Sequence, residues 1–437
     1  MPSVTHQIFE YALLLALGSV VLLDRYAPQD LLLTPAQLVY HKLAAYALLA
    51  ALLVLHHWRK ELLPAYVALA LRVASLVAAS PTATALLEAP FPHNVWVERI
   101  SIVGVMLSAL VAFIFPLPDL ARVPYIHHGA HLAKGLRDFS NVPEWCFNNL
   151  SNAFLAAVAD APVAEKPAGG FPLAIFSHGL GGSLELYAFV NQQLASAGNV
   201  VVVVNHSDGS ACVTRPEDDR IEYYQQITDA VRHNIDGEGY RFRNAQLRTR
   251  VQEVRRVLNA VSELKTQEQS DKSLWASINL QRVHAVGHSF GAATALTATH
   301  LDNRFGATVL LDAWMEPLDD SVRDGFGNRA PVLHLVSDPF AEWTPNAESV
   351  KRHARGCSHP LTRVKRIVGT RHNNFSDLPL FSPLINRLVK TSGSIDPVYA
   401  LRMVSQLSAT FLVDQYDAAV EKYPEVVELD SETKQTK

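Results

Sequence analysis

The chain has little cysteine and little charge for its length. Only three cysteines occur in 437 residues. Cys146, Cys212 and Cys357 lie far apart without a CxxC pair, which argues against a disulfide framework or a structural zinc site. Charged residues make up 18% of the sequence, and the 38 basic and 42 acidic residues nearly cancel, so no basic stripe indicates nucleic-acid binding. A hydrophobic fraction of 49% excludes a disordered chain, because disorder requires low hydrophobicity and high net charge.

Four stretches before residue 120 are rich in Ala, Leu and Val. They are Ile8–Leu23, Leu43–Leu55, Leu62–Ala79 and Ile100–Phe115. The stretches are apolar all round rather than amphipathic, and with their flanks they approach the roughly 20 residues of a bilayer-spanning helix. We therefore predict three or four transmembrane helices, against the alternative of a soluble bundle with buried leucine faces.

Charges near these stretches predict the localisation. Met1–Gln7 has no Lys or Arg, so a cleaved signal peptide is not expected. The larger number of flanking basic residues lies on the side of the termini, and the positive-inside rule then predicts that both termini, and with them the long region after the fourth stretch, lie in the cytoplasm. Glu10 and Arg72 lie inside apolar stretches and would need to face a partner helix or to reach the membrane surface by snorkelling. The sequence thus predicts an integral, multi-pass membrane protein that has the bilayer as a partner.

A different pattern begins at Phe171. Short β-branched runs such as Val200–Asn205 alternate with helical patterns such as Asn244–Leu264. This alternation predicts an α/β fold with a mainly parallel sheet and helices on both faces, and Ser207–Arg243 is predicted to be a lid or pocket wall. The predicted domains are a membrane-embedded helical region at 1–120, a connecting segment at 121–170, a catalytic domain at 171–425 and a polar tail at 426–437.

The run GHSFG at residues 287–291 fits G-x-S-x-G. It lies between a predicted strand, Val283–Gly287, and a predicted helix, Phe290–His300. In such a nucleophile elbow the serine occupies a strained strand-to-helix turn, and the glycines let the strand and helix approach each other. The helix N-terminus favours developing negative charge. Ser289 is therefore the predicted nucleophile, with a tight structural turn as the alternative.

The run HGLGG at residues 178–182 follows an earlier predicted strand. Hydrolases with this type of elbow hold the oxyanion with two backbone N–H groups, one after the nucleophile and one from an early loop. Phe290 and Leu180 are the predicted donors. A glycine-rich turn that only links a strand to a helix is the alternative, and a phosphate loop is disfavoured because no G-K-[ST] follows.

A nucleophilic serine needs a base and an orienting acid, which follow it along the chain. The histidines that follow Ser289 are His300, His334, His353, His359 and His372. His372 lies in a loop after a late predicted strand, where the base belongs, whereas the others end a helix, lie in a strand or fall in a basic stretch. Asp312 and Asp338 end neighbouring strands, and this reasoning leaves both open as the acid.

Several separate motifs together resemble the platelet-activating factor acetylhydrolase family of the plasma type, the lipoprotein-associated phospholipase A2. They are HGLGG at 178–182, NHSDGSA at 205–211, RNAQLR at 243–248, GHSFGAA at 287–293, LDAWMEPL at 311–318 and HNNFSD at 372–377. The resemblance covers roughly Phe171 to Leu412 and implies the α/β-hydrolase fold. It implies Ser289 as nucleophile, His372 as base and Asp312 as acid, which leaves Asp338 structural or a fallback. It also maps the oxyanion donors to Leu180 and Phe290.

The resemblance implies a calcium-independent serine hydrolase that removes an acetyl, short or oxidised sn-2 acyl chain from a phospholipid through an acyl-enzyme. Neither a metal nor an organic cofactor is expected. Trp314 is predicted to line the acyl pocket, with core packing as the alternative. The chain departs from the secreted plasma enzyme at its N-terminus. A membrane-tethered carboxylesterase or thioesterase acting on a non-phospholipid ester, and a non-catalytic membrane scaffold, are the alternative functions.

Overall fold

The computed structural model describes residues 122–124, 129–144, 147, 154–215, 220–234, 237–268, 270, 273–381, 386, 390–413 and 416–429. The chain divides into two compact units, one formed by Pro124–Leu155 with Asp160–Lys437 and the other by Met1–Val123 with Ala156–Ala159. The first of these contains the catalytic fold. Of the other, only parts of two short strands are described, β1 (Arg122–Pro124) and β2 (Phe154–Val158).

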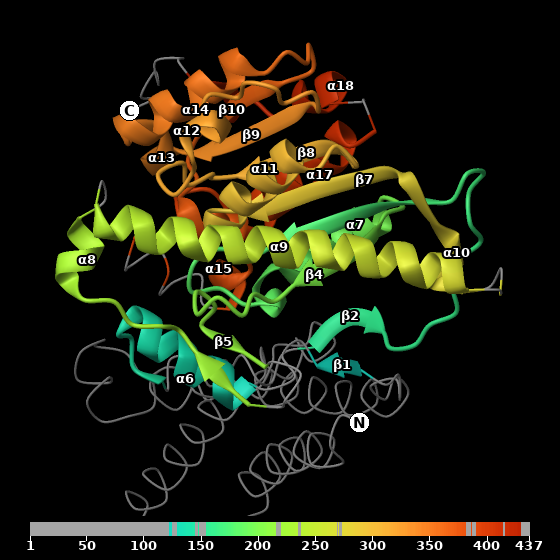
Figure 1. Ribbon diagram of the computed structural model, residues 1–437, viewed down its shortest axis with the longest axis horizontal. Helices are drawn as coiled ribbons and strands as arrows, with labels where there is room; N and C mark the ends of the chain where they lie inside the picture. The colour runs from blue at the N-terminus through green and yellow to red at the C-terminus, as the bar shows by residue number, and fades with distance from the viewer. Residues whose placement is uncertain are drawn as a thin grey trace, which may run out of the picture. The chain divides into compact units, whose positions relative to one another are not determined.

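A seven-stranded sheet forms the centre of the catalytic unit, in the order β11-β10-β9-β8-β7-β3-β4 (Figure 1). Its strands are β3 (Phe171–Ser177), β4 (Val200–Val204), β7 (Ile278–His288), β8 (Phe305–Leu311), β9 (Val332–Ser337), β10 (Arg363–Ile367) and β11 (Val426–Glu428). Neighbouring strands run parallel except β10 and β11. The carboxyl ends of the parallel strands therefore meet at one edge, where ligands bind in open α/β sheets.

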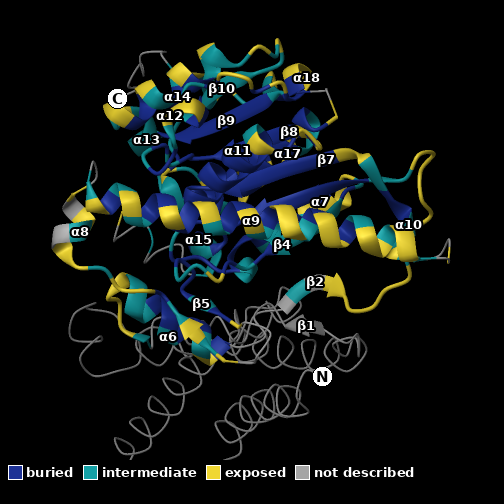
Figure 2. Ribbon diagram, in the orientation of Figure 1, coloured by how far each residue is buried: buried dark blue, intermediate teal, exposed yellow. Residues whose placement is uncertain are grey.

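Helices cover both faces of this sheet. Along β3, Leu173 and Ile175 point to the face covered by α9 and α11, whereas Ala174 and Phe176 point to the face covered by α7 and α17, as the period of two in a strand requires. Figure 2 shows the strands buried between these layers. The helices are α6 (Gly129–Ser140), η3 (Leu184–Tyr187), α7 (Ala188–Ser196), α8 (Asp229–His233), α9 (Glu238–Gln267), α10 (Leu274–Ser277), α11 (Phe290–Leu301), α12 (Asp320–Arg323), α13 (Asp338–Glu342), α14 (Thr344–Gly356), η4 (His372–Phe375), α15 (Leu378–Phe381), α17 (Pro397–Phe411) and α18 (Tyr416–Val420).

The interval Ser207–Arg243 has little regular structure. It contains the short antiparallel pair of β5 (Val213–Thr214) and β6 (Glu222–Tyr223), the single turn of α8 and the beginning of α9. The suggestion that it serves as a lid or pocket wall stays a prediction.

The α/β-hydrolase part of the predicted fold agrees with this architecture. The predicted N-terminal bundle of transmembrane helices is wrong as far as the structure describes the chain. Within the described ranges no helix combines the length and the apolar character needed to cross a bilayer. Helix α9 has 30 residues but carries charged side chains along its length, whereas the more apolar α11 and α17 have 12 and 15 residues. A span needs about 20 mostly apolar residues.

The predicted multi-pass, integral-membrane localisation loses its basis for the same reason. The four apolar stretches that supported it, together with Glu10 and Arg72, lie outside the described residues.

Candidate active site

Ser289 occupies a strained turn between β7 and α11. Its φ of 57° and ψ of −116° lie where side chains other than glycine are rarely found, at a cost of about 1–3 kcal/mol. Two backbone hydrogen bonds hold the turn: the Ser289 N–H donates to the Leu311 carbonyl at 2.8 Å, and the Ser289 carbonyl accepts from the Trp314 N–H at 3.2 Å. The chain segment on either side of Asp312 is thus attached directly to the turn that carries Ser289.

The two glycines of G-x-S-x-G are required by close backbone contacts. A Cβ atom at Gly291 would lie 2.0 Å from the Ser177 carbonyl oxygen, and one at Gly287 would lie 2.2 Å from the Gly291 carbonyl oxygen. Any larger residue at either position would push α11 away from β3 or from β7. The spacing of the motif therefore has the packing reason expected of a nucleophile elbow.

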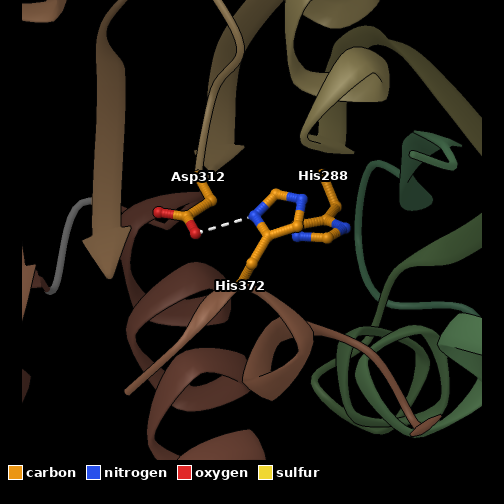
Figure 3. A group of neighbouring side chains, drawn as sticks. All are labelled: His288, Asp312 and His372. Carbon is orange, nitrogen blue, oxygen red and sulfur yellow. Dashed lines mark hydrogen bonds and ion pairs between the residues drawn. The ribbon is translucent and has the colours of Figure 1, made fainter. Parts of the chain in front are cut away.

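His372 and Asp312 form a hydrogen-bonded dyad. His372 Nδ1 lies 2.9 Å from Asp312 Oδ2, and Figure 3 shows the His372 ring between the Asp312 carboxylate and the His288 ring. The carboxylate is completely buried and also accepts hydrogen bonds from the Ser337 backbone N–H and hydroxyl, both at 2.6 Å. With the proton held on Nδ1 by the carboxylate, Nε2 of His372 is left as the acceptor that a general base needs.

The His372 ring is packed on both faces but remains accessible. Phe340 stacks on it at 4.5 Å between ring centroids with an interplanar angle of 5°, and His288 packs at 4.4 Å. The side chain is 34% exposed. Among the described residues, no hydrogen bond joins the Ser289 hydroxyl to His372; such bonds are often long before the substrate is bound.

The HGLGG loop lies directly against the elbow. A Cβ atom at Gly179 would be 3.2 Å from the Ser289 Cβ. The neighbouring N–H groups are occupied, because Gly179 donates to the Tyr187 hydroxyl at 3.0 Å and Gly181 donates to the Ser210 carbonyl at 2.8 Å. In the part of the chain that the structure describes, the N–H groups of Leu180 and Phe290 have no such partner, so both are available to an incoming oxyanion.

The two open candidates for the acid differ in what they contact. Asp338 accepts from the Arg366 side chain at 2.6 Å and from the Gly369 backbone N–H at 2.8 Å. It therefore links β10 to the loop that leads to His372, whereas Asp312 bonds to the imidazole itself. Of the two carboxylates, the structure brings Asp312 to His372.

Trp314 lies beside the elbow. Its ring meets the Phe290 ring edge-on, with 5.4 Å between centroids, and its indole N–H donates to Glu316 at 2.9 Å. The predicted acyl-pocket role and the alternative of core packing are both compatible with this position. The buried His334 and His353 bond to each other at 3.0 Å, so these two alternative bases pair with each other rather than with Asp312.

Sequence reasoning missed Arg250, which is completely buried on α9. Its guanidinium donates to the His178 carbonyl at 2.7 Å and to Asp208 at 3.1 Å, and it lies 4.5 Å from the centroid of the Phe290 ring. Burial lowers the pKa of Arg250, and the Asp208 carboxylate opposes that shift. A signal existed, because this arginine falls in the apolar stripe of α9 that includes Leu247 and Val251.

His288, Asp312 and His372 are also close enough to be considered as metal ligands, with one potential ligand atom from each within 4.8 Å of the others. The two imidazole rings are tilted at 37° to each other with 4.4 Å between their centroids, and Nδ1 of His372 is already hydrogen-bonded to Asp312. The Asp312 carboxylate already accepts three hydrogen bonds. The arrangement fits a hydrogen-bonded dyad better than a metal site.

Known proteins match much of this chain. The family model described as platelet-activating factor acetylhydrolase, isoform II, matches residues 124–434. A platelet-activating factor acetylhydrolase of Gallus gallus is 30% identical over 317 residues, which cover 67% of this chain and 74% of that protein. A putative phospholipase A2 of Schizosaccharomyces pombe is 26% identical over 408 residues, which cover 77% of this chain and 90% of that protein.

Two further matches concern the substrate class and the fold. A probable 1-alkyl-2-acetylglycerophosphocholine esterase of Arthroderma benhamiae is 27% identical over 228 residues, covering 48% of this chain and 49% of that protein. The structure of a ferulic acid esterase from Streptomyces cinnamoneus matches with a TM-score of 0.54 at 21% identity, covering 71% of this chain and 85% of that one; this likeness shows the fold alone. The family and the ester-hydrolase class predicted from the motifs are confirmed. The chain belongs to the platelet-activating factor acetylhydrolase family.

Proposed function

We propose that Ser289, His372 and Asp312 hydrolyse the sn-2 acyl ester of a phospholipid through an acyl-enzyme. As a member of its family, the chain is an ester hydrolase that acts on the acetyl ester of a phospholipid. The observation that carries the residue assignment is the dyad of His372 and Asp312, joined at 2.9 Å beside a serine on a strained elbow.

The first half of the reaction forms the acyl-enzyme. Nε2 of His372 takes the proton of the Ser289 hydroxyl while the oxygen attacks the ester carbonyl. The tetrahedral intermediate then collapses, the bond to the glycerol oxygen breaks, and His372 returns the proton to that leaving oxygen. Asp312 holds the imidazole in the required tautomer and stabilises the imidazolium that forms.

The second half releases the acid. Water, deprotonated by His372, attacks the acyl carbonyl, and the bond to Ser289 breaks as His372 returns the proton to the serine oxygen. In both halves the N–H groups of Leu180 and Phe290 hold the negative oxygen. One such donor is typically worth about 3–4 kcal/mol. Because the base and the oxyanion donors all come from the chain, the proposed reaction is independent of calcium.

A substrate panel tests this proposal, with calcium chelated throughout. The panel contains a 1-alkyl-2-acetyl phospholipid, its long-chain sn-2 counterpart, p-nitrophenyl acetate and an acetyl thioester, each assayed with the native protein and with Ser289→Ala. We expect the 2-acetyl phospholipid to be cleaved with the highest kcat/KM and the Ser289→Ala variant to cleave none of the four. A preference for the thioester or for long sn-2 chains would contradict the proposed specificity. Activity in Ser289→Ala would contradict the proposed nucleophile.

A further inference from the structure

Tyr187 lies where the HGLGG loop, the elbow and the base come together. It ends η3, and only 3% of the residue is exposed. Its hydroxyl is 3.0 Å from the backbone nitrogen of Gly179 and 2.9 Å from Nδ1 of His288. The ring also packs against the His288 ring at 5.5 Å between centroids. One hydroxyl group thus joins two segments that are more than 100 residues apart along the chain.

The direction of these hydrogen bonds follows from the protonation states. The Gly179 N–H can only donate, so the Tyr187 oxygen accepts from it. Burial raises the pKa of Tyr187, which keeps the phenol protonated, and burial lowers the pKa of His288 well below its usual range, which keeps that ring neutral. The hydroxyl proton therefore points to Nδ1 of His288. The two hydrogen bonds form a chain of hydrogen bonds, in which the Gly179 N–H donates to the Tyr187 oxygen and the Tyr187 O–H donates to His288.

Both ends of this chain adjoin groups with proposed catalytic roles. Gly179 precedes Leu180, and the Gly179 carbonyl belongs to the same peptide group as the Leu180 N–H. That carbonyl accepts from His178 Nδ1 at 2.8 Å and from the Gly182 N–H at 3.1 Å. Gly179 is therefore held on both sides, by Tyr187 through its N–H and by its neighbours in the loop through its carbonyl.

The other end of the chain adjoins the nucleophile and the base. His288 precedes Ser289 in the elbow, and its ring packs on His372 at 4.4 Å between centroids. Among these loop contacts, the Tyr187 hydroxyl is the hydrogen-bonding group that connects the HGLGG loop to the elbow residue next to Ser289.

We infer that the Tyr187 hydroxyl is a positioning group that fixes the oxyanion-binding loop relative to Ser289. The inference rests on the roles proposed above for Ser289 and Leu180. Backbone donors stabilise an oxyanion only when they are already aimed at the position where the charge develops, and a displacement of about 1 Å can cost about a hundredfold in rate. Without the hydroxyl, the loop would keep its sequence and its donor but would lose its fixed distance from the nucleophile.

Tyr187→Phe tests the inference, because it removes one oxygen atom and keeps the ring. With p-nitrophenyl acetate we expect kcat to fall by about 10- to 100-fold while KM changes little. Affinity for an alkyl trifluoromethyl ketone, which forms a negatively charged adduct with the serine, should weaken in parallel with kcat/KM. The matched control is Tyr416→Phe: Tyr416 is buried, its hydroxyl has no hydrogen-bond partner among the described residues, and its loss should leave all three quantities unchanged.

A second variant guards against a folding defect. His288→Phe removes the acceptor but keeps an aromatic ring against His372, so it should show the same selective loss of kcat and of ketone affinity. The double variant should lose little more than either single variant, because both break one chain. Multiplicative losses, or an unchanged ketone affinity in either single variant, would overturn the inference.

The Ser289→Ala variant separates this inference from the proposed function. If Ser289→Ala is inactive and Tyr187→Phe is fully active, the inference alone is overturned. If Ser289→Ala remains active, the proposed function fails and the inference fails with it.

Discussion

The described part of the molecule contains two sets of side chains that each combine a serine, a histidine and an acid. In the first, Ser289, His372 and Asp312 lie at the carboxyl ends of β7, β10 and β8. In the second, the Ser177 hydroxyl is 2.7 Å from Nε2 of His206, whose Nδ1 is 2.7 Å from Glu253. Judged by hydrogen bonds alone the second set is the more complete, because the Ser289 hydroxyl is not bonded to His372 in the described structure.

The two sets differ in the backbone strain at the serine and in the exposure of the histidine. Ser177 ends a regular strand, and both Ser177 and His206 are completely buried. Ser289 instead lies on a turn with φ of 57°, and its base is one-third exposed. In the described part of the chain the N–H groups of Leu180 and Phe290, in the loop and the helix that flank the elbow, have no hydrogen-bond partner, whereas Ser177 lies inside the fold. A triad of hydrogen bonds is therefore not by itself a catalytic site. A serine on a strained turn, with a partly exposed base and backbone donors that have no partner among the described residues, has the features that acyl transfer through a serine nucleophile requires.

The largest expected effect on activity distinguishes the two serines, Ser289 and Ser177. Ser289→Ala should lower the hydrolysis of p-nitrophenyl acetate by about 10⁴-fold or more, because no other group can form the acyl-enzyme. Ser177→Ala should keep most of its activity and lose only the stability that a buried hydrogen bond provides, about 1–3 kcal/mol. Steady-state kinetics and urea unfolding measure the two quantities. Loss of activity in both variants to the same extent would contradict the distinction.

The second prediction concerns the acids. Asp312→Asn should lower kcat by about 10⁴-fold, because an amide at this position favours the wrong tautomer of His372. Asp338→Asn should have a much smaller effect, since Asp338 contacts Arg366 and the Gly369 N–H instead of the imidazole. Circular dichroism spectra of both variants provide the folding control. The reverse ranking would transfer the role of the acid to Asp338.

The sequence was sufficient for the features that depend on local pattern. The elbow, the glycine-rich loop and the strands that precede them follow from short runs whose spacing is set by backbone packing, as the close approach of Gly291 to Ser177 illustrates. The choice between Asp312 and Asp338 could not be made from pattern, because both end neighbouring strands. It needed the resemblance to the family at the sequence level, and in the structure it depends on which carboxylate reaches the imidazole.

Contacts between segments that are distant along the chain could not be predicted from the sequence. Tyr187 and His288 are joined by a hydrogen bond across 101 positions, and nothing in either motif indicates the other. The membrane spans predicted from the apolar stretches near the N-terminus have no counterpart among the described helices, and the stretches themselves lie outside the described residues. Arg250 was overlooked although a charged residue in the buried stripe of α9 is a readable signal for a buried polar network.

The third prediction tests the second serine set as a structural element. Burial lowers the pKa of His206 and keeps its ring neutral, so Nδ1 donates to Glu253, which also accepts from the Ser207 N–H at 3.1 Å. Glu253→Gln leaves one of these donors without an acceptor and should lower the free energy of unfolding by about 1–3 kcal/mol, with kcat little changed. The matched control is the exposed Glu263 on the same helix, where Glu263→Gln should be neutral. A large loss of kcat in Glu253→Gln without a loss of stability would contradict the structural role.

The smallest effect is expected at His284, a buried histidine that has no hydrogen-bond partner in the described part of the chain. Both ring nitrogens of His284 are buried and have no hydrogen-bond partner among the described residues. Burial, with a further contribution from the positive charge of Arg282, lowers its pKa from 6.5 to about 4. Between these two pH values the unfolded chain binds a proton that the folded chain does not, so the stability is complete above pH 6.5 and falls as the pH is lowered toward 4. One pH unit below 6.5, the expected loss is about 1 kcal/mol.

His284→Leu cannot titrate and should remove this part of the pH dependence. Urea unfolding of the native protein and of the variant at pH 4.5, 5.5, 6.5 and 7.5 measures the effect, and the variant should show the shallower decline below pH 6.5. The comparison at pH 7.5 is the internal control, because there the imidazole is neutral in both the folded and the unfolded chain. Parallel pH curves for the two proteins would mean that His284 takes up its proton in the folded state at its ordinary pKa, and burial would then not be what lowers the pKa of this histidine.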